Sequence, residues 1–286
     1  MSSVDFSFSS QVDGLSLKGL HWPREGAQAA VLILHGLAEH CRRYDRFAGV
    51  LNAANVEVFA YDHRGHGATA HSEREFGKFS FEALISDITG AIKAIREQSS
   101  APKLFLFAHS MGSFAAQAFL PDGASEIDGV ILSGSADYAL IAQVAAAQPE
   151  AAGFAALNAG FEPARTAFDW LSRDDAEVDK YVNDPACGFD PTEETAASML
   201  GGGAALANPD EWLKIPKNLP VYIFSGEKDP VHFGGGLFTS LVEKFRSAGI
   251  SDLTDRLYPG GRHEMLNETN RDEVMGDVVA WLQKRS

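Results

Sequence analysis

The sequence has few cysteines and no long hydrophobic run. Cys41 and Cys187 are its only cysteines, which excludes a small fold held together by several disulfides. We expect both to be free thiols, although two cysteines leave one disulfide open. Neither they nor the nine histidines fall at the spacing of zinc ligands, so the sequence predicts no metal site and no cofactor. No segment is apolar enough to predict a membrane-spanning helix.

Basic residues are also scarce. The chain has 24 lysines and arginines against 39 acidic residues, which gives a net charge of −15. This acidity argues against nucleic acid and against anionic membrane surfaces as partners. Neutral or zwitterionic lipids and small esters stay open as substrates. The first ten residues lack the basic and apolar pattern of a signal peptide, so we expect a cytoplasmic protein.

Short apolar runs alternate with amphipathic segments over most of the chain. Residues 4–20 predict two antiparallel strands. This order of elements is typical of an α/β fold with a mostly parallel central sheet flanked by helices, which binds ligands at the carboxyl ends of its strands. Further strands are expected at 30–35, 56–61, 103–108, 128–133, 221–224 and 253–258, and helices near 43–54, 80–98 and 111–120.

The segment between the strands near 133 and 221 is far too long for one crossover helix. We predict a core domain of residues 1–136 and 213–286 with a helical cap inserted at 137–212. From Tyr138 to Phe161 the only charged residue is Glu150, and Pro149 separates two short helices. Their apolar stripes predict an acyl-binding tunnel, and Gly201-Gly202-Gly203 suits a hinge. The tunnel residues are expected to be Ile141, Val144, Phe154 and Leu157.

Ala108-His109-Ser110-Met111-Gly112 joins a predicted buried strand to a predicted helix. A serine in a tight strand-to-helix turn, with small residues two before and two after it, is typical of the nucleophile elbow of α/β-hydrolases. The turn forces the serine into a strained backbone conformation and exposes its hydroxyl above the sheet. Ala108 stands where glycine is usual. The pattern predicts Ser110 as a nucleophile.

Two later loops supply the partners that a serine nucleophile needs. Asp229 follows the apolar run 221–224, and His263 follows the strand expected at 253–258. The order Ser110, Asp229, His263 is the chain order of an α/β-hydrolase triad. His263 is expected to take and return the proton, and Asp229 to orient His263. Glu227 stays open as an alternative acid.

The predicted strand at 30–35 ends in His35-Gly36-Leu37, ahead of the elbow. An acyl-transfer site needs two backbone N–H groups aimed at the developing oxyanion. The residue after the nucleophile supplies one, and the loop after this strand supplies the other. We expect these donors to be Met111 and Leu37.

Three segments together carry a family resemblance. They are His35-Gly36-Leu37-Ala38-Glu39-His40-Cys41-Arg42-Arg43-Tyr44, then Asp62-His63-Arg64-Gly65-His66-Gly67, then the segment 259–268 around His263. They resemble the signatures of monoacylglycerol lipases and related bacterial lysophospholipase-like serine hydrolases, of the serine aminopeptidase S33 type. The resemblance spans about residues 12–284. It implies an α/β-hydrolase fold, the triad above, and a monoacylglycerol or lysophospholipid ester as substrate.

Some residues of these segments are candidates for contact with the alcohol part of a substrate. Glu39, Arg43 and the loop from Asp62 to Gly67 follow strands whose carboxyl ends face the site, so some of these groups could bind a glycerol-like leaving group. An internal ion pair that braces the oxyanion loop is an equal alternative. His35, Gly36 and His109 are also expected to contact substrate.

The sequence therefore predicts a serine hydrolase that cleaves carboxylic esters through an acyl-enzyme intermediate. A short-chain carboxylesterase or an aminopeptidase-type hydrolase is the alternative, and a hydrolase-fold binding protein without turnover is a remote one. The expected partner is a small lipid or ester. Transient contact of the cap with a membrane or micelle and the oligomeric state stay open.

Overall fold

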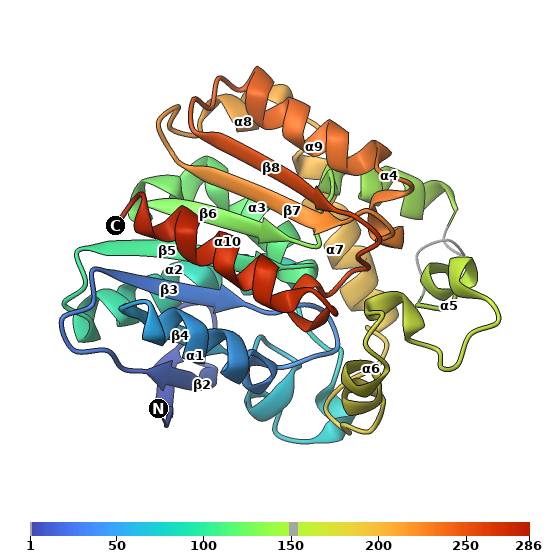
Figure 1. The fold of residues 1–286 in the computed structure, drawn as a ribbon, viewed down its shortest axis with the longest axis horizontal. Coiled ribbons are helices and arrows are strands. Elements are labelled where there is room, and N and C mark those ends of the chain that lie inside the picture. The colour runs from blue at the N-terminus through green and yellow to red at the C-terminus, as the bar shows by residue number, and fades with distance from the viewer. Residues whose placement is uncertain (1, 149–153) are drawn as a thin grey trace.

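The computed structural model describes residues 2–148 and 154–286. In this part of the chain an eight-stranded sheet lies between two layers of helices (Figure 1). The strands follow the order β1-β2-β4-β3-β5-β6-β7-β8 across the sheet. Their bounds are β1 (Val4–Ser9), β2 (Ser16–Trp22), β3 (Ala29–Leu34), β4 (Val56–Tyr61), β5 (Lys103–His109), β6 (Gly129–Ser133), β7 (Val221–Gly226) and β8 (Leu253–Tyr258).

The sheet is mostly parallel. β2 pairs antiparallel with β1 and β4, whereas all other neighbouring strands from β3 to β8 pair in parallel. Apart from Lys103 at the start of β5, the residues of the strands from β3 to β7 are all buried, as expected where helices cover both faces of a sheet. The predicted fold class is confirmed, and the strand bounds differ from the expected ones by a few residues.

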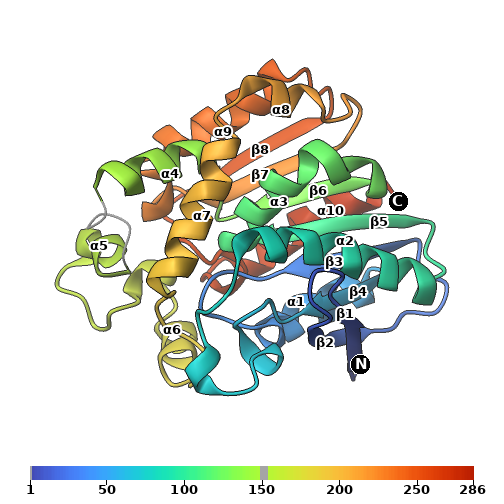
Figure 2. The same ribbon diagram turned by 180° about the vertical axis from the view of Figure 1, so that it is seen from behind.

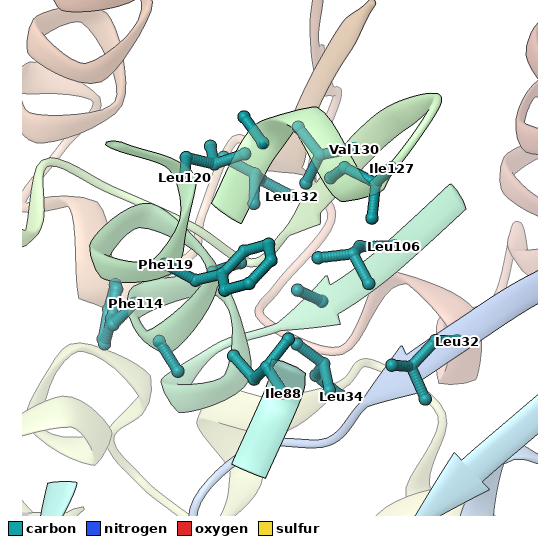
Figure 3. Packing of buried hydrophobic residues seen from close by; sticks show 14 of the residues in the cluster. Leu32, Leu34, Ile88, Leu106, Phe114, Phe119, Leu120, Ile127, Val130 and Leu132 are labelled. Atoms are coloured by element: carbon teal, nitrogen blue, oxygen red, sulfur yellow. The ribbon is translucent and has the colours of Figure 1, made fainter. Parts of the chain in front are cut away.

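Helices cover the two faces of the sheet unequally. α1 (Asp45–Ala53) and α10 (Arg271–Gln283) pack on one face, in front in Figure 1. α2 (Phe81–Gln98), α3 (Met111–Gly123) and α9 (Gly236–Ser247) pack on the other (Figure 2). Figure 3 shows Leu106 and Leu132 of the strands packed with Phe119 of α3. This packing makes the sheet a rigid support for the loops at its carboxyl edge.

The long segment between β6 and β7 carries further helices. Most of them gather at one end of the sheet, on the right of Figure 1. Two short helices, α4 and α5, occur where they were expected, whereas Pro149 and Glu150 lie outside the described residues. The predicted boundary after residue 212 falls inside α8, whose Trp212 packs edge-on against Phe245 of α9. The helices are α4 (Tyr138–Ala147), α5 (Phe154–Asn158), α6 (Asp175–Val182), α7 (Glu193–Ala205) and α8 (Pro209–Leu213).

The glycine triplet expected to form a hinge lies inside helix α7. A Cβ atom on Gly203 would come within 2.6 Å of the Ala142 Cβ atom, and one on Gly202 would come within 2.6 Å of the Phe81 ring. Gly202 and Gly203 therefore let α7 approach α2 and α4 closely, and the structure has a packed helix where a hinge was expected. In the described part of the chain, no helix has the length and apolar character needed to cross a membrane.

Candidate active site

Ser110 lies at the turn between β5 and α3, and its backbone is strained. Its φ is 50° and its ψ is −121°, a region that residues other than glycine rarely adopt. The Ser110 N–H donates to the Ser133 carbonyl oxygen at 3.0 Å, and the Ser110 carbonyl oxygen accepts from the Ser113 N–H at 2.8 Å. A side chain at Gly112 would overlap the Leu34 carbonyl oxygen, so α3 can approach β3 only because that position is glycine.

Asp229 follows β7 and His263 follows β8, and their buried side chains meet. His263 Nδ1 lies 2.9 Å from Asp229 Oδ2. The same carboxylate accepts from the Ser225 hydroxyl at 2.5 Å and from the Val231 N–H at 2.9 Å. Because an ionised carboxylate only accepts, the His263 proton sits on Nδ1, and Nε2 is left as a proton acceptor.

The ionisation of this pair is coupled. Burial alone would raise the pKa of Asp229, but the charge and hydrogen bond of His263, with help from Ser225, outweigh it and lower the pKa to about 2. Burial alone would lower the pKa of His263, but the Asp229 carboxylate outweighs it and raises the pKa above its usual value of 6.5. Asp229 thus stays charged at neutral pH and stabilises a protonated His263.

Glu227, the alternative acid, faces solvent. Its carboxylate accepts from the Gly260 N–H at 3.0 Å and lies 3.7 Å from Lys228 Nζ. The structure therefore brings Asp229, and not Glu227, to His263.

The loop after β3 runs directly beside the elbow. A Cβ atom on Gly36 would lie 3.2 Å from the Ser110 Cβ atom, so a side chain there would crowd the serine. Ala38 has a φ of 56°, which is strained for an alanine. Its N–H donates to His66 Nε2 at 3.2 Å, and this bond helps to hold the turn. The loop is thereby fixed close to the hydroxyl of Ser110.

The two expected oxyanion donors, the N–H groups of Leu37 and Met111, directly follow Gly36 and Ser110 in the chain. The Leu37 N–H has no hydrogen-bond acceptor within residues 2–148 and 154–286. The Met111 N–H belongs to the first residue of α3, where helical N–H groups have no partner within the helix. Both residues line the cavity at Ser110, so both N–H groups are available to a substrate oxygen there.

Glu39 braces the oxyanion loop. Its Oε1 accepts from the Gly36 N–H at 2.6 Å and from the Tyr44 hydroxyl at 2.8 Å. Arg43 donates to Glu39 at 2.7 Å and to both oxygens of Glu264 at 2.6 and 2.7 Å. Burial alone would raise the pKa of Glu39, but the Arg43 charge outweighs it and lowers the pKa to about 2. This is the internal ion pair, the second of the two roles considered for these residues.

Two residues expected to contact substrate do not line the cavity. Arg43 is engaged by Glu39 and Glu264. His35 is fully buried, with its Nδ1 donating to the Gly36 carbonyl oxygen at 2.7 Å and its Nε2 accepting from the His63 N–H at 3.0 Å. The structure therefore places neither His35 nor Arg43 against the cavity, because their polar groups are bound inside the protein.

The loop after β4 supports the oxyanion loop from another side. Asp62 Oδ1 accepts from the Cys41 N–H at 2.7 Å. Gly67 has a φ of 44°, and a side chain there would overlap the Asp62 carboxylate. Burial lowers the pKa of His66 to about 3, so its ring is neutral and can accept from Ala38. The residues of this loop hold the backbone of the site.

A cavity of about 310 Å³ opens at Ser110. Asp229 lies behind His263 and does not line it. Sequence reasoning missed several of its walls, namely Tyr138, Trp170, Met199, Leu200, Phe233 and Glu264. The expected residues that do line it are Gly36, Leu37, Glu39, His109, Ser110, Met111, Ile141, Val144, Phe154, Leu157 and His263.

The loop that carries His263 is fastened to the segment before α6. The His263 N–H donates to the Trp170 carbonyl oxygen at 3.4 Å, and the Glu264 N–H donates to the Leu171 carbonyl oxygen at 2.8 Å. The Trp170 ring packs on the His263 ring with 4.9 Å between centroids. Part of the insertion thus positions His263. The position of Glu264 directly after His263 could have indicated that it lies at the site. Its role as the carboxylate partner of Arg43 is not visible in the sequence.

One group of residues was not expected to meet. His40, Asp184 and Cys187 place one donor atom each within 4.8 Å of one another. No short motif links them, because His40 lies on the oxyanion loop and the other two lie between α6 and α7. Cys41 and Cys187 are both free thiols, so the disulfide that the sequence left open is not formed.

The chain is similar over most of its length to known hydrolases and lipases. Residues 25–270 match the family of serine aminopeptidases S33. Monoglyceride lipase from Mus musculus is 28% identical over 290 residues, which cover 96% of this chain and 88% of the mouse protein. Monoacylglycerol lipase from Mycolicibacterium smegmatis is 28% identical over 268 residues, which cover 91% of this chain and 90% of the bacterial protein.

Solved structures share the fold over the whole chain. A thermostable carboxyl esterase from Bacillus coagulans, in complex with glycerol, has a TM-score of 0.85 at 24% identity, over 100% of this chain and 99% of the esterase. A soluble variant of monoglyceride lipase from Saccharomyces cerevisiae, in complex with a substrate analog, has a TM-score of 0.78 at 25% identity, over 100% of this chain and 96% of the yeast chain. With its family match over residues 25–270 and its eight-stranded fold, the chain belongs to the serine aminopeptidase S33 family of α/β-hydrolases.

Proposed function

We propose that this protein is a serine hydrolase that cleaves the ester bond of monoacylglycerol-type lipids through an acyl-enzyme intermediate. The observation that carries the proposal is a strained serine that lines an apolar cavity together with His263, whose ring is held by the buried Asp229 carboxylate. Strain at a non-glycine residue persists only where the surrounding structure holds it, and it concentrates at functional sites.

The proposed reaction has two halves. In the first, Ser110 Oγ attacks the ester carbonyl carbon while His263 Nε2 takes the hydroxyl proton, and the Leu37 and Met111 N–H groups bind the oxyanion. The tetrahedral intermediate collapses, the alcohol leaves with the proton from His263, and the acyl group stays on Ser110. In the second half, water gives its proton to His263 and attacks the acyl carbon, and Ser110 leaves with that proton.

The acyl chain is assigned to the wall formed by α4, α5 and α7. Ile141, Val144, Leu157 and Met199 line the cavity there, and an apolar pocket favours an alkyl chain over a charged group. We propose that residues 137–212 act as a cap over this site. Relatives named monoglyceride lipase or monoacylglycerol lipase support a glycerol ester as substrate.

An aminopeptidase is less well supported. Such an enzyme needs a free carboxylate to hold the α-amine of its substrate. Among the described residues, the acids that line the cavity are Glu39 and Glu264, and Arg43 engages both. The charged groups near Ser110 therefore favour a neutral substrate.

Contact with lipid aggregates is the last part of the proposal. Phe233 lines the cavity, yet 48% of the residue is exposed. An exposed aromatic ring at the rim of an apolar cavity is suited to transient insertion into a micelle or membrane surface.

The test is a substrate panel on the purified protein. It comprises 1-monoacylglycerols of increasing acyl length, lysophospholipids with the same acyl chains, simple alkyl esters and aminoacyl amides, each measured as kcat/KM. Lipids are assayed below and above the concentration at which they form micelles, and Ser110→Ala serves as the blank. We expect the long-chain monoacylglycerols to be best, with a further gain above the micelle threshold.

Each other outcome identifies an alternative. Fastest cleavage of acetyl or butyryl esters would mean a short-chain carboxylesterase, and preference for lysophospholipid at equal chain length would mean a lysophospholipase. Cleavage of amides alone would mean an aminopeptidase. Binding of lipid without turnover of any substrate would mean a binding protein.

A further inference from the structure

His40, Asp184 and Cys187 form a compact group of donor atoms between the oxyanion loop and the insertion. His40 Nε2 donates to Asp184 Oδ2 at 2.9 Å, and the three donor atoms lie within 4.8 Å of one another. All three residues are partly exposed, so an ion from solvent can reach them. None lines the cavity at Ser110, and the proposed reaction uses none of them.

The local backbone holds two of the donors in place. The Cys187 N–H donates to the Asp184 carbonyl oxygen at 3.0 Å, so both side chains come from one turn. The Ala186 N–H donates to Asp184 Oδ1 at 2.9 Å, which leaves Oδ2 facing His40. The carboxylate is therefore oriented before any ion binds, which lowers the entropy cost of forming a site.

We propose that this group binds a thiophilic divalent cation of the zinc class. Its ligands are His40 Nε2, Asp184 Oδ2 and Cys187 Sγ, and water fills the fourth position. A nitrogen, an oxygen and a sulfur donor suit zinc, whereas magnesium and calcium require oxygen ligands. Because a thiolate and a carboxylate balance the two positive charges, the filled site is neutral.

The distances require only a small adjustment. In a tetrahedral zinc site, neighbouring ligand atoms are about 3.5 Å apart. The His40 and Asp184 atoms are 2.9 Å apart, and the Cys187 sulfur lies within 4.8 Å of both. On binding, the ion displaces the thiol proton of Cys187 to solvent. The proton of a neutral His40 moves from Nε2 to Nδ1, which frees the Nε2 lone pair.

The ion would join two segments that already touch. The Ala38 carbonyl oxygen accepts from the Tyr181 hydroxyl at 2.9 Å and from the Gly188 N–H at 3.0 Å. His40 is two residues beyond Ala38, and Cys187 directly precedes Gly188. A bound ion therefore fastens the insertion to the oxyanion loop, stabilises the fold and slows turnover that requires the cap to move. The effect on turnover rests on the proposed function, whereas binding does not.

The experiment is a titration of the purified full chain with Co²⁺, which reports its ligands by absorption. We expect one equivalent to give the visible bands of tetrahedral cobalt and a near-ultraviolet thiolate-to-cobalt band. Cys187→Ser should lose the thiolate band. His40→Gln and Asp184→Asn should each weaken binding by more than about tenfold, since even outer-shell partners of a metal are worth that much. Cys41→Ala and the exposed His71→Gln are the matched controls and should bind as wild type.

Zn²⁺ gives the second readout. It should raise the unfolding temperature of the wild type and slow its ester hydrolysis, both reversed by a chelator, and leave Cys187→Ser unaffected. No thiolate band in the wild type, an equal band in Cys187→Ser, or weak binding shared by all variants would overturn the site. A cobalt site without any effect of Zn²⁺ on hydrolysis would overturn only the link to turnover. A protein that cleaves no ester would still give the cobalt spectrum, so the two failures are distinguishable.

Discussion

The cavity has two walls of different construction. The catalytic wall is held by buried charges and short hydrogen bonds, and it is formed by Gly36, Leu37, Glu39, Ser110, Met111, His263 and Glu264. Glu39 alone binds the Gly36 N–H, Tyr44 and Arg43. The acyl wall, formed by α4, α5 and α7, is built from apolar side chains and from close contacts between helices, such as the one at Gly203.

The difference fits the roles that we propose for the two walls. Donors that stabilise a developing charge must be fixed within a fraction of an ångström, because reorienting them during the reaction would cost free energy. Apolar packing has no direction, so a wall of alkyl groups can accept chains of different length. A substitution in the catalytic wall should therefore affect every ester equally, and one in the acyl wall should affect long chains selectively.

The largest effect is expected from the catalytic wall itself, in Ser110→Ala. Without a nucleophile, only the oxyanion donors and binding remain, and kcat should fall by several orders of magnitude on every ester. The fold should be retained, which circular dichroism and the unfolding temperature check. A folded variant with a tenth of the wild-type rate would remove Ser110 from the mechanism.

Asp229→Asn should have the second largest effect, a loss of about 10⁴-fold in kcat. The amide keeps the shape of the carboxylate but can hold His263 in the wrong tautomer. Glu227→Gln is the matched control, because its carboxylate faces solvent and binds the Gly260 N–H instead. Its kcat should stay within a few-fold of wild type. The opposite order of the two effects would make Glu227 the acid.

The pH profile gives a second readout of the same pair. His263 must be neutral to take the proton, so kcat/KM should rise with pH through its pKa, which Asp229 raises above 6.5. In Asp229→Asn the raising charge is lost, and burial then lowers the pKa of His263. The remaining activity should therefore rise at a lower pH than in wild type. An unchanged acid limb would mean that another group controls it.

Arg43→Ala tests the brace. It leaves Glu39 and Glu264 buried without their shared cation, and removal of one partner from a buried ion pair costs about 3–5 kcal/mol of stability. Glu39 should then take up a proton at a higher pH and release the Gly36 N–H. Activity should fall by a similar factor on all esters, together with the unfolding temperature. A rise in KM confined to glycerol esters, at unchanged stability, would instead favour contact with substrate.

Much of the fold was predictable because the strands from β3 to β7 are buried on both faces. Such strands are continuous apolar runs, such as Ala29–Leu34, and they can be recognised without knowing what covers them. The glycines of α7 were misread for the opposite reason. Three consecutive glycines disfavour a helix locally, and only the presence of α4 and α2 beside them explains why a helix forms there.

The residues of the site likewise divide into those that a local sequence pattern indicates and those that depend on tertiary packing. Ser110, Asp229, His263 and the oxyanion loop each stand in a local pattern after a strand, so the sequence could indicate them. The Arg43–Glu264 pair joins residues that are 221 positions apart, and no local pattern predicts it. The burial of His35 and the meeting of His40 with Cys187 also depend on tertiary packing. Sequence patterns indicate which side chains react, but not which ones hold them.

The smallest effect on kcat/KM, and the one most selective for long acyl chains, is expected from a substitution in the acyl wall. Val144 lines the cavity from α4, away from the groups that brace Ser110. If the acyl chain lies against it, each methylene buried there should add about 0.8 kcal/mol, and kcat/KM of the wild type should climb with chain length until the cavity is full. Val144→Asp should flatten that climb and leave short esters nearly unchanged, because a carboxylate on the cavity wall opposes an alkyl chain but does not reach the oxyanion donors. Val182→Asp, at an exposed valine, is the matched control and should keep the wild-type slope.

Profiles that peak at acetyl or butyryl esters in wild type and variant alike would show that this wall does not select the chain. An equal loss on short and long esters would show that the two walls are not independent.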